Sequence, residues 1–290
     1  MKGDLTAFQV AKLLQIFPFD NLFFSRQLFL NKLRGVMMLL QNRVALVTGA
    51  SRGIGAATAK VLAKRGALVA VSARTVSDLE CLATSIREEG GQALVVPGDV
   101  LDAAQVQEMI NRVVEEWGRL DILVNNAGLG TATMPVEKIP PEEWDYTVAL
   151  NLKSAFLCVR TAAPVMKRQG FGRIINVSSF AGRNYSRISG PQYGAAKAGL
   201  QGFTKHMAVE LGPHGVCVNA VAPSIVLTDR VKAKWEARTE GERQMILAGI
   251  PLRRLAQPEE VATVIAFLAS EDASYVNGVC IDINGGSYMV

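Results

Sequence analysis

The chain has 290 residues, of which 49% are hydrophobic and 20% charged, and its formal net charge is +5 at pH 7. This length and composition are typical of a folded chain with a sizeable core, and they exclude intrinsic disorder. Five basic side chains lie in residues 1–36 against two acidic ones. The remainder is therefore only slightly basic, and we expect no nucleic-acid partner.

Residues 1–40 do not share the pattern of the remainder, and we treat them as an N-terminal extension that is incidental to function. The segment is apolar and basic, but Pro18 and Asp20 interrupt it, so no run reaches the ~20 residues of a membrane span. It lacks the layout of a secretory signal and is poor in the Ser and Arg of a transit peptide. A surface amphipathic helix and a natural start at Met37 or Met38 both stay open.

The next stretch has the pattern of a buried strand, a glycine-rich turn and the start of a helix. Aliphatic residues after Arg43 suit a central parallel strand that is covered on both faces. Gly49, Gly53 and Gly55 permit a tight turn, close approach of an anion to the backbone, and close packing of the helix on the sheet. Free N–H groups and the positive end of the helix dipole then predict a pyrophosphate site. A purely structural turn would use the same glycines, and the spacing G-x-x-x-G-x-G is not that of most dinucleotide folds.

Strand and helix patterns alternate over residues 41–290, which predicts one α/β domain with a doubly wound, mostly parallel, seven-stranded sheet of Rossmann type. The expected strands cover residues 43–47, 67–72, 93–96, 120–124, 173–178, 216–221 and 279–283. After the helix that the glycine turn opens, the expected helices cover residues 78–89, 103–117, 141–168, 193–211 and 258–270. Residues 228–248 are charged and have no strand pattern, so we expect a helical insertion over the ligand edge, where such a segment acts as a lid.

The second strand ends without the carboxylate that would bind the ribose hydroxyls of NAD(H) and repel a 2′-phosphate. It leads instead into Arg74, and Arg52 in the glycine turn supplies another cation near the same expected position. Planar guanidinium groups suit phosphate, although a solvated surface position is equally typical of each arginine. We therefore expect NADP(H) rather than NAD(H) as the cofactor.

A candidate catalytic pair follows further along the chain. Tyr193 and Lys197 are four residues apart and so share one helix face. An ammonium beside a phenol lowers the pKa of the phenol and makes it usable as an acid or base near neutral pH. Ser178 and Ser179 end a strand, where a hydroxyl can donate to a carbonyl oxygen that gains negative charge. Alone these patterns are typical of a helix surface and a turn; together, downstream of a dinucleotide turn, they favour chemistry.

These residues resemble the motifs of the short-chain dehydrogenase/reductase family, and the likeness covers residues 41–290. It rests on the sequence TGASRGIG at residues 48–55, on Asp99, Asn151 and Ser179, and on NNAG at 125–128, YGAAK at 193–197 and NAVAP at 219–223. The resemblance implies reduction of a carbonyl by hydride from the nicotinamide.

The resemblance also implies a role for each residue. Tyr193 would be the general acid/base, and Lys197 would lower its pKa and hold the nicotinamide ribose. Ser179 would orient the carbonyl, and Asn151 would hold a water that connects Lys197 to solvent. The implied cofactor-binding residues are Gly49, Ser51, Arg52, Gly53, Ile54, Gly55, Arg74, Asp99, Val100, Asn125, Ala127, Gly128, Tyr193, Lys197, Val226 and Thr228.

Within that family the chain looks most like the 3-oxoacyl-[acyl-carrier-protein] reductases, which implies an acyl thioester substrate, a carrier-protein partner and a homotetramer. Several substrate-facing positions depart from their pattern. Ser224 replaces a glycine, His214 stands where those reductases often have an arginine, and residues 183–191 form a longer loop with Arg183 and Arg187. The segment 232–243 is also longer. A general ketone or sugar/polyol dehydrogenase, and a non-catalytic dinucleotide-binding regulator, therefore stay open.

The four cysteines are far apart and show neither metal-ligand nor redox spacing. We expect no metal site and take the cysteines as reduced core residues of an intracellular, cytoplasmic protein.

Overall fold

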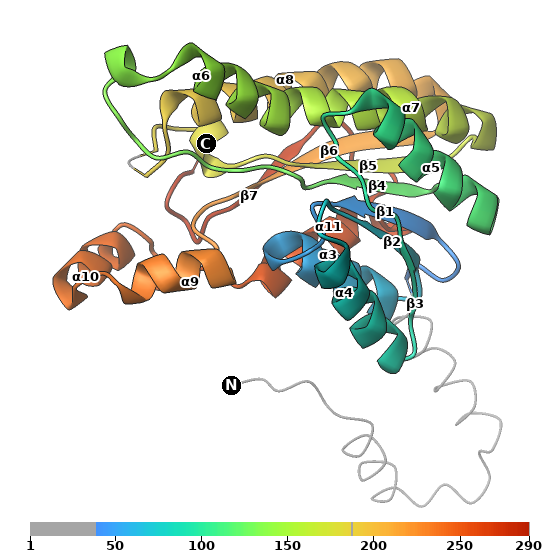
Figure 1. Ribbon diagram of the computed structural model, residues 1–290, viewed down its shortest axis with the longest axis horizontal. Helices are drawn as coiled ribbons and strands as arrows, with labels where there is room; N and C mark the ends of the chain where they lie inside the picture. The colour runs from blue at the N-terminus through green and yellow to red at the C-terminus, as the bar shows by residue number, and fades with distance from the viewer. Residues whose placement is uncertain (1–38, 187, 290) are drawn as a thin grey trace, which may run out of the picture. The chain divides into compact units, whose positions relative to one another are not determined.

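Seven parallel strands form one sheet with the order β3-β2-β1-β4-β5-β6-β7 (Figure 1). The computed structural model describes residues 39–186 and 188–289. Its strands are β1 (Val44–Thr48), β2 (Leu68–Ser72), β3 (Gln92–Val95), β4 (Ile122–Asn125), β5 (Gly172–Val177), β6 (Val216–Pro223) and β7 (Cys280–Ile283). The predicted fold class, a doubly wound α/β domain with a seven-stranded parallel sheet, is confirmed.

Helices cover both faces of this sheet. In Figure 1, α3, α4 and α11 lie below it, and α5, α7 and α8 lie above it. Their bounds are α3 (Gly53–Lys64), α4 (Val76–Glu88), α5 (Ala103–Trp117), α7 (Ser154–Gln169), α8 (Pro191–Leu211) and α11 (Pro258–Leu268). Because each crossover between parallel strands is a helix, all strands end at the same edge of the sheet, where ligands bind in such folds.

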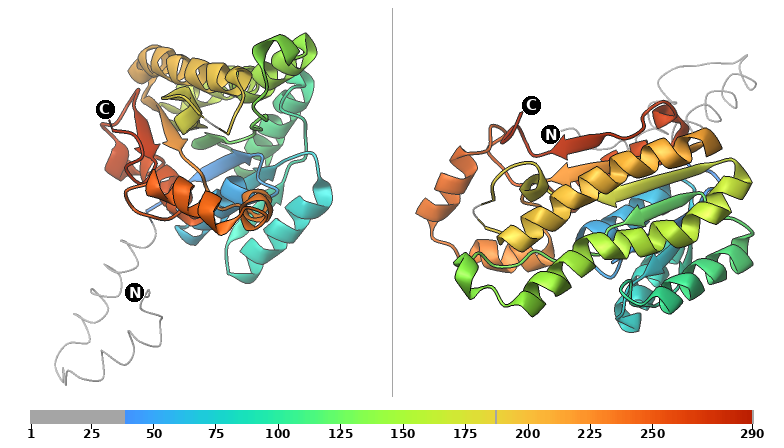
Figure 2. Two further views of the ribbon diagram at one scale, coloured as in Figure 1. Left: turned by 90° about the vertical axis from the view of Figure 1, so that its left-hand side faces the viewer. Right: turned by 90° about the horizontal axis from the view of Figure 1, so that it is seen from above.

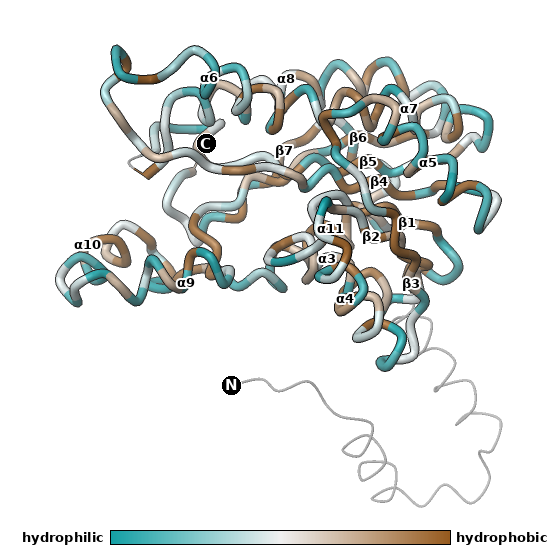
Figure 3. Tube along the Cα trace, in the orientation of Figure 1, coloured by the Kyte–Doolittle hydropathy of each residue, from teal (hydrophilic) through white to brown (hydrophobic). Residues whose placement is uncertain are grey.

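Two hydrophobic cores, one on each face, explain why the strands are almost wholly aliphatic. Every residue of β1 is buried, with Val47 in one core and Leu46 in the other. Figure 3 shows the same arrangement, with hydrophobic colour concentrated along the strands and on the inner faces of the helices. Full burial of one such side chain contributes about 2 kcal/mol, so the alternating faces of β1 stabilise both layers.

The insertion predicted over residues 228–248 consists of two helices, α9 (Asp229–Glu236) and α10 (Glu240–Ala248). They lie together beyond one edge of the sheet (Figures 1 and 2). Thr239 and Glu242 form a capping box that starts α10. The helical character of this insertion is confirmed, and its action as a lid stays a prediction.

The long helix expected over residues 141–168 is interrupted. The structure has α6 (Pro141–Val148), a turn of π-helix (Ala149–Lys153) and then α7. Such a wide turn often marks a functional site, and here it contains Asn151. The turn contains neither proline nor glycine, so the sequence carries no breaker that would reveal it.

The cysteine prediction is only partly right. Cys158 is buried, but Cys217 and Cys280 are partly exposed and Cys81 is exposed, and all four are free thiols. Among the described residues, no helix is long and apolar enough to cross a membrane, and no cluster of ligands suits a metal ion. The apolar segment 1–36 and Arg187 lie outside the described residues.

Candidate active site

The glycine turn between β1 and α3 has the conformation that its sequence predicts. Gly49 and Gly53 have φ values of +63° and +58°, which side chains rarely adopt. A Cβ atom at Gly55 would collide with the carbonyl oxygen of Gly49 and lie 2.5 Å from Asn126 Nδ2. The N-cap position of α3 is Arg52, which makes no side-chain cap. The first N–H groups of α3 are therefore left to bind an anion.

Two residues without an assigned role, Thr48 and Asn126, hold this turn against the end of β4. The Asn126 amide donates to the carbonyl oxygens of Thr48 (2.9 Å) and Gly49 (3.0 Å). The Thr48 hydroxyl accepts from the N–H groups of Asn126 and Ala127. The sequence does contain the two groups, a hydroxyl at the last position of β1 and a side-chain amide directly after β4. Local propensity does not show that these two groups bind one another's segments.

Other predicted cofactor-binding residues adjoin the turn. A Cβ atom at Gly53 would lie 3.0 Å from Thr228 Cγ2, so the start of α9 contacts the start of α3. Thr228 also caps α9, because its hydroxyl accepts from Val231 N–H. Val226 is buried and bridges to Ala256.

Asn151 is buried in the π-helical turn and joins two elements. Its side-chain amide donates to the carbonyl oxygens of Leu129 (3.0 Å) and Thr147 (2.9 Å), and its Oδ1 accepts from Leu129 N–H (3.1 Å). A Cβ atom at Gly128 would lie 2.6 Å from Asn151 Oδ1 and 3.2 Å from Lys197 Nζ. The absence of a side chain at Gly128 thus lets Asn151 and Lys197 converge on the same point.

Tyr193 and Lys197 lie on α8, one turn apart as predicted. The Lys197 ammonium is buried, donates to the Val177 carbonyl oxygen at 2.7 Å, and lies 5.7 Å from the centroid of the Tyr193 ring. Gly182 packs so closely on this part of α8 that a Cβ atom there would lie 2.6 Å from Lys197 C.

The structure distinguishes the two serines after β5. The Ser178 hydroxyl donates to the Lys197 carbonyl oxygen (2.9 Å) and accepts from Gln201 Nε2 (3.0 Å), so it anchors α8. The Ser179 side chain forms a hydrogen bond with Tyr193. Ser179 is therefore the serine within reach of the phenol, as the family motif implies.

The expected electrostatic effect of Lys197 on Tyr193 is not what the structure shows. Burial raises the pKa of the Tyr193 phenol, and the hydrogen bond from Ser179 offsets only part of that rise. Burial also lowers the pKa of Lys197 from 10.5 to about 8. The cause is that both groups leave water, which disfavours the charged form of each. The hydrogen bond that favours the phenolate comes from Ser179 rather than from Lys197.

Of the other predicted cofactor-binding residues, two are exposed arginines and three lie in the segments that follow β3 or end β4. Arg52 and Arg74 are exposed, and neither forms an ion pair within the described ranges. Asp99 turns its carboxylate back to accept from Leu101 N–H (2.9 Å), and Val100 is buried. Asn125 is buried and donates to Asn176 Oδ1 (2.8 Å), which ties β4 to β5.

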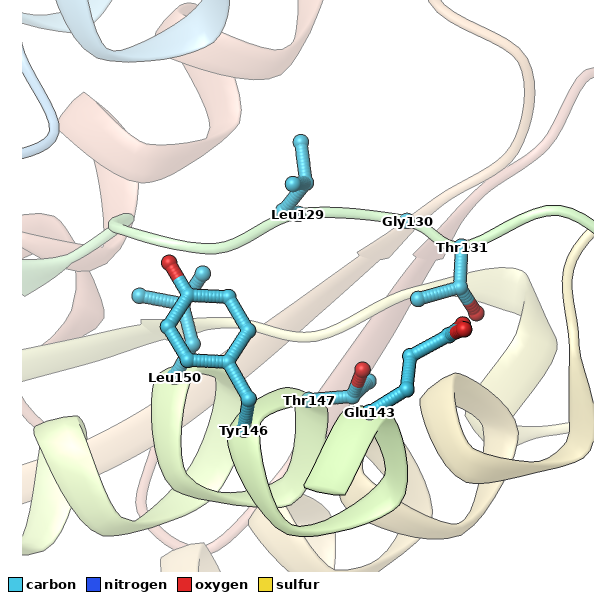
Figure 4. A pocket seen from close by; sticks show the side chains of 7 residues that line it. All are labelled: Leu129, Gly130, Thr131, Glu143, Tyr146, Thr147 and Leu150. Atoms are coloured by element: carbon cyan, nitrogen blue, oxygen red, sulfur yellow. The ribbon is translucent and has the colours of Figure 1, made fainter. Parts of the chain in front are cut away.

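A pocket of about 250 Å³ lies beside this cluster, between α6 and the loop after β4. Figure 4 shows Glu143, Tyr146 and Thr147 projecting from α6 toward the segment 129–131. None of the four predicted catalytic residues lines it. Its wall at Leu129 is nevertheless fixed by Asn151, through the hydrogen bonds described above.

Known proteins are similar to this chain in sequence and fold. Residues 49–288 match the family model described as Enoyl-(Acyl carrier protein) reductase. The 3-oxoacyl-[acyl-carrier-protein] reductase FabG of Staphylococcus aureus (strain Mu50) is 41% identical over 249 residues, which cover 84% of this chain and 98% of that protein.

Two solved structures extend the comparison. A 3-oxoacyl-[acyl-carrier protein] reductase from Brucella melitensis with bound NAD has 34% sequence identity and a TM-score of 0.78, covering 89% of this chain and 96% of its own. Levodione reductase has 33% sequence identity and a TM-score of 0.80, and the match covers 85% of this chain and 98% of that one. The chain therefore belongs to the short-chain dehydrogenase/reductase family of oxidoreductases.

Proposed function

We propose that this protein is an NADPH-dependent reductase that converts the carbonyl of a 3-oxoacyl thioester to an alcohol. The observation that carries the proposal is the convergence of Asn151, Lys197 and Gly128 beside a Tyr193 that is hydrogen-bonded to Ser179. These groups follow or face the carboxyl ends of β4 and β5, the edge at which the glycine turn also lies. A non-catalytic regulator would need the turn but not this convergence.

The residues of the turn fit a dinucleotide. Uncapped N–H groups at the start of α3 suit a pyrophosphate, and the lack of a side chain at Gly55 brings the helix close to the sheet. When bound, the nicotinamide supplies the hydride for the carbonyl carbon. The protein's contribution is therefore orientation, electrostatics and the proton.

The proton comes from Tyr193 in this proposal. The Ser179 hydroxyl donates a hydrogen bond to the substrate oxygen and holds the carbonyl beside the phenol. As negative charge develops on that oxygen, Tyr193 transfers its proton to it, which completes the alcohol. The hydrogen bond from Ser179 favours the phenolate that remains, and the Lys197 ammonium lies 5.7 Å from the centroid of its ring.

Reprotonation of Tyr193 is assigned to Lys197 and Asn151. The pKa of about 8 at Lys197 lets its ammonium give up a proton near neutral pH more readily than an ordinary lysine. Asn151 holds the carbonyl of Leu129, and Asn151 Oδ1 and Lys197 Nζ both lie close to Gly128. A water held there would connect the ammonium to solvent.

The preference for NADP(H) rests on charge. No carboxylate follows β2, and Arg52 and Arg74 are exposed cations at the ends of the glycine turn and of β2. A 2′-phosphate suits two guanidinium groups. The Brucella melitensis relative with bound NAD makes NAD(H) the alternative.

Two features bear on the substrate. The similarity to 3-oxoacyl-[acyl-carrier-protein] reductases favours an acyl thioester, whereas the similarity to levodione reductase favours a general ketone. Lys167 and Arg168 end α7, and His214 precedes β6, so all three lie at the amino-end edge of the sheet, opposite Ser179. A carrier protein docked on them would therefore lie at the opposite end of the sheet from Ser179. Residues of α7 and α8 are also the proposed contacts of a homotetramer, because Phe156 and Val209 are exposed there.

A substrate and cofactor matrix tests the proposal. Acetoacetyl-CoA and acyl-carrier thioesters, set against a panel of ketones and sugars, are assayed with NADPH and with NADH. Thioester reduction with a higher kcat/KM for NADPH supports it. Turnover of ketones or sugars alone would favour the general dehydrogenase, and cofactor binding without oxidation by any carbonyl would favour the regulator. Light scattering in the same buffer measures the oligomeric state.

A further inference from the structure

Arg183 is bound to the last strand of the sheet, four residues after Ser179. Its Nε donates to Asp282 Oδ1 at 3.1 Å, and its second terminal nitrogen donates to Oδ2 at 2.8 Å. The side chains of Arg183 and Asp282 are only 22% and 17% exposed. Such a two-bond guanidinium–carboxylate pair fixes geometry as well as charge. The proposed mechanism makes no use of it.

The residues between Ser179 and Arg183 form one hydrogen-bonded turn. The Ser179 hydroxyl accepts from Ala181 N–H (3.1 Å), and its carbonyl oxygen accepts from Gly182 N–H (2.9 Å). Arg183 N–H donates in turn to the Phe180 carbonyl oxygen (2.9 Å). Because this short 3-10 turn (Phe180–Gly182) links the two residues, a shift of Arg183 is transmitted to the Ser179 side chain.

A residue near the C-terminus contacts this turn at a second point. The residues that follow Arg183 in the chain are exposed. The Phe180 ring packs edge-to-face on Tyr288, with centroids 6.1 Å apart. After Arg183, Tyr185 is 74% exposed and Ile188 50%. Within the described residues of this loop, the ion pair is therefore a partly buried polar anchor between Ser179 and the exposed positions Tyr185 and Ile188.

We propose that the Arg183–Asp282 pair is a positioning element of the active site, which holds the Ser179 hydroxyl at Tyr193 and at the substrate oxygen. Arg183 is in this view a positioning residue and not a catalytic one. The proposal rests on the proposed function, because it assigns to the pair an effect on carbonyl reduction. Arg183 is also one of the positions at which the loop departs from the pattern of 3-oxoacyl reductases.

A purely structural pair would behave differently. Loss of an ion pair that only stabilises the fold would lower the free energy of unfolding and leave kcat unchanged in the folded fraction. A displaced serine would lower kcat, because misplacement of a reacting group by about 1 Å costs up to 10²-fold. KM for the thioester would change little if Ser179 acts mainly in the transition state.

The experiment compares Arg183→Gln with Arg119→Gln, using NADPH oxidation by the best carbonyl substrate of the wild-type protein. Arg119 forms a similar two-bond pair with Asp121 (2.8 and 2.6 Å), but at the amino end of β4. We expect kcat to fall about tenfold in Arg183→Gln and less than about twofold in Arg119→Gln, with KM within about threefold in both.

A double-mutant cycle shows whether Arg183 acts through Ser179. Ser179→Ala and the double variant Ser179→Ala with Arg183→Gln are assayed at high enzyme concentration. The kcat of the double variant should be within about twofold of that of Ser179→Ala alone. The reversed pair Arg183→Asp with Asp282→Arg should recover part of the activity lost in either single variant. If Arg183→Gln fails to fold, Arg183→Lys, which keeps the charge but loses the fork, replaces it throughout.

The outcomes separate the two proposals. Equal losses of kcat in both backgrounds, or an Arg183→Gln variant that matches Arg119→Gln, overturn the positioning role while the proposed function stands. A wild-type protein that reduces no carbonyl overturns the proposed function instead.

Discussion

The two ends of the parallel sheet treat polar groups in opposite ways. At the amino end, Asp121 is fully buried. Its carboxylate accepts from two nitrogens of the Arg119 guanidinium and from Val44 N–H. Arg43 and Arg173 both pair with Glu271, and their guanidinium groups lie 3.9 and 4.4 Å from the centroid of the Phe171 ring. The charges of these side chains beside β1, β4 and β5 are therefore paired within the chain.

At the carboxyl end, both donors and acceptors lack protein partners within the described part of the chain. The first turn of α3 has no side-chain cap, and Asn125 Oδ1 is buried without a hydrogen bond among the described residues. Lys197 is buried and donates to one carbonyl oxygen, and no carboxylate of residues 39–186 or 188–289 forms an ion pair with it. Unpaired buried polar groups are costly, so a fold keeps them where a ligand or a reaction uses them. We infer that the amino end stabilises the domain and the carboxyl end performs its chemistry.

The strongest test of this division is Tyr193→Phe. Removal of the phenol hydroxyl removes the proposed acid, so kcat should fall by about 10³-fold, while the Kd for NADPH, measured by fluorescence titration, stays within about twofold. Tyr275→Phe is the matched control, because Tyr275 is fully exposed, and it should retain wild-type kcat. Substantial turnover by Tyr193→Phe would remove that residue from the mechanism.

Asp121→Asn tests the amino end. Loss of the charge on this buried carboxylate leaves Arg119 without a counter-ion, whereas Arg43 keeps its ion pair with Glu271. The Arg119 side chain is 42% exposed, so the expected cost is that of a lost charge-assisted hydrogen bond, about 2 kcal/mol. The free energy of unfolding, measured with urea, should fall by about that amount. At about 20 °C, where circular dichroism should show the variant to be still folded, kcat should stay near the wild-type value. A variant with wild-type stability and low kcat would reverse the assignment of the two ends.

Lys197 makes the stability of the carboxyl end depend on pH. Its pKa is about 8 in the folded chain and 10.5 for the ordinary side chain, so between these values the unfolded chain binds more protons. Stability relative to a Lys197→Met variant should therefore rise from pH 8 to 10.5, by up to about 3 kcal/mol. Below pH 8 the burial penalty is fully present, and the difference between the two proteins should be flat. Urea unfolding of both proteins across this range measures it, and a difference that falls with pH would contradict the buried ammonium.

The sequence predicts the features of this fold that depend on local chemistry. Aliphatic runs, glycines with positive φ and the i, i+4 pair of Tyr193 and Lys197 are visible as patterns, because each is dictated by its immediate neighbours. The ends of the strands and helices follow within about two residues, the usual uncertainty of such boundaries.

What the sequence does not predict are contacts between distant segments. The pairing of Arg183 with Asp282 and of Arg43 with a buried Asp121 joins residues that are far apart in the sequence and whose spacing carries no pattern. The pKa of Tyr193 is another case: sequence spacing shows the nearby ammonium but not the burial, which has the larger effect. The roles of Ser178 and Ser179 likewise depend on which residue of α8 each hydroxyl contacts, and only the three-dimensional structure shows that.

The smallest expected effect concerns the cofactor, at the carboxyl end of β2. Arg74 is exposed, so its contact with a 2′-phosphate would be partly screened by water and salt. We expect Arg74→Asp to lower kcat/KM for NADPH about tenfold and to reverse the NADPH preference, because the new carboxylate repels the phosphate and binds ribose hydroxyls. Arg112→Asp makes the same change of charge at an exposed position of α5, and it should leave the ratio of the two cofactors unchanged. If both variants shift that ratio equally, the preference arises from the net charge of the protein rather than from Arg74, and the 2′-phosphate contact is wrong.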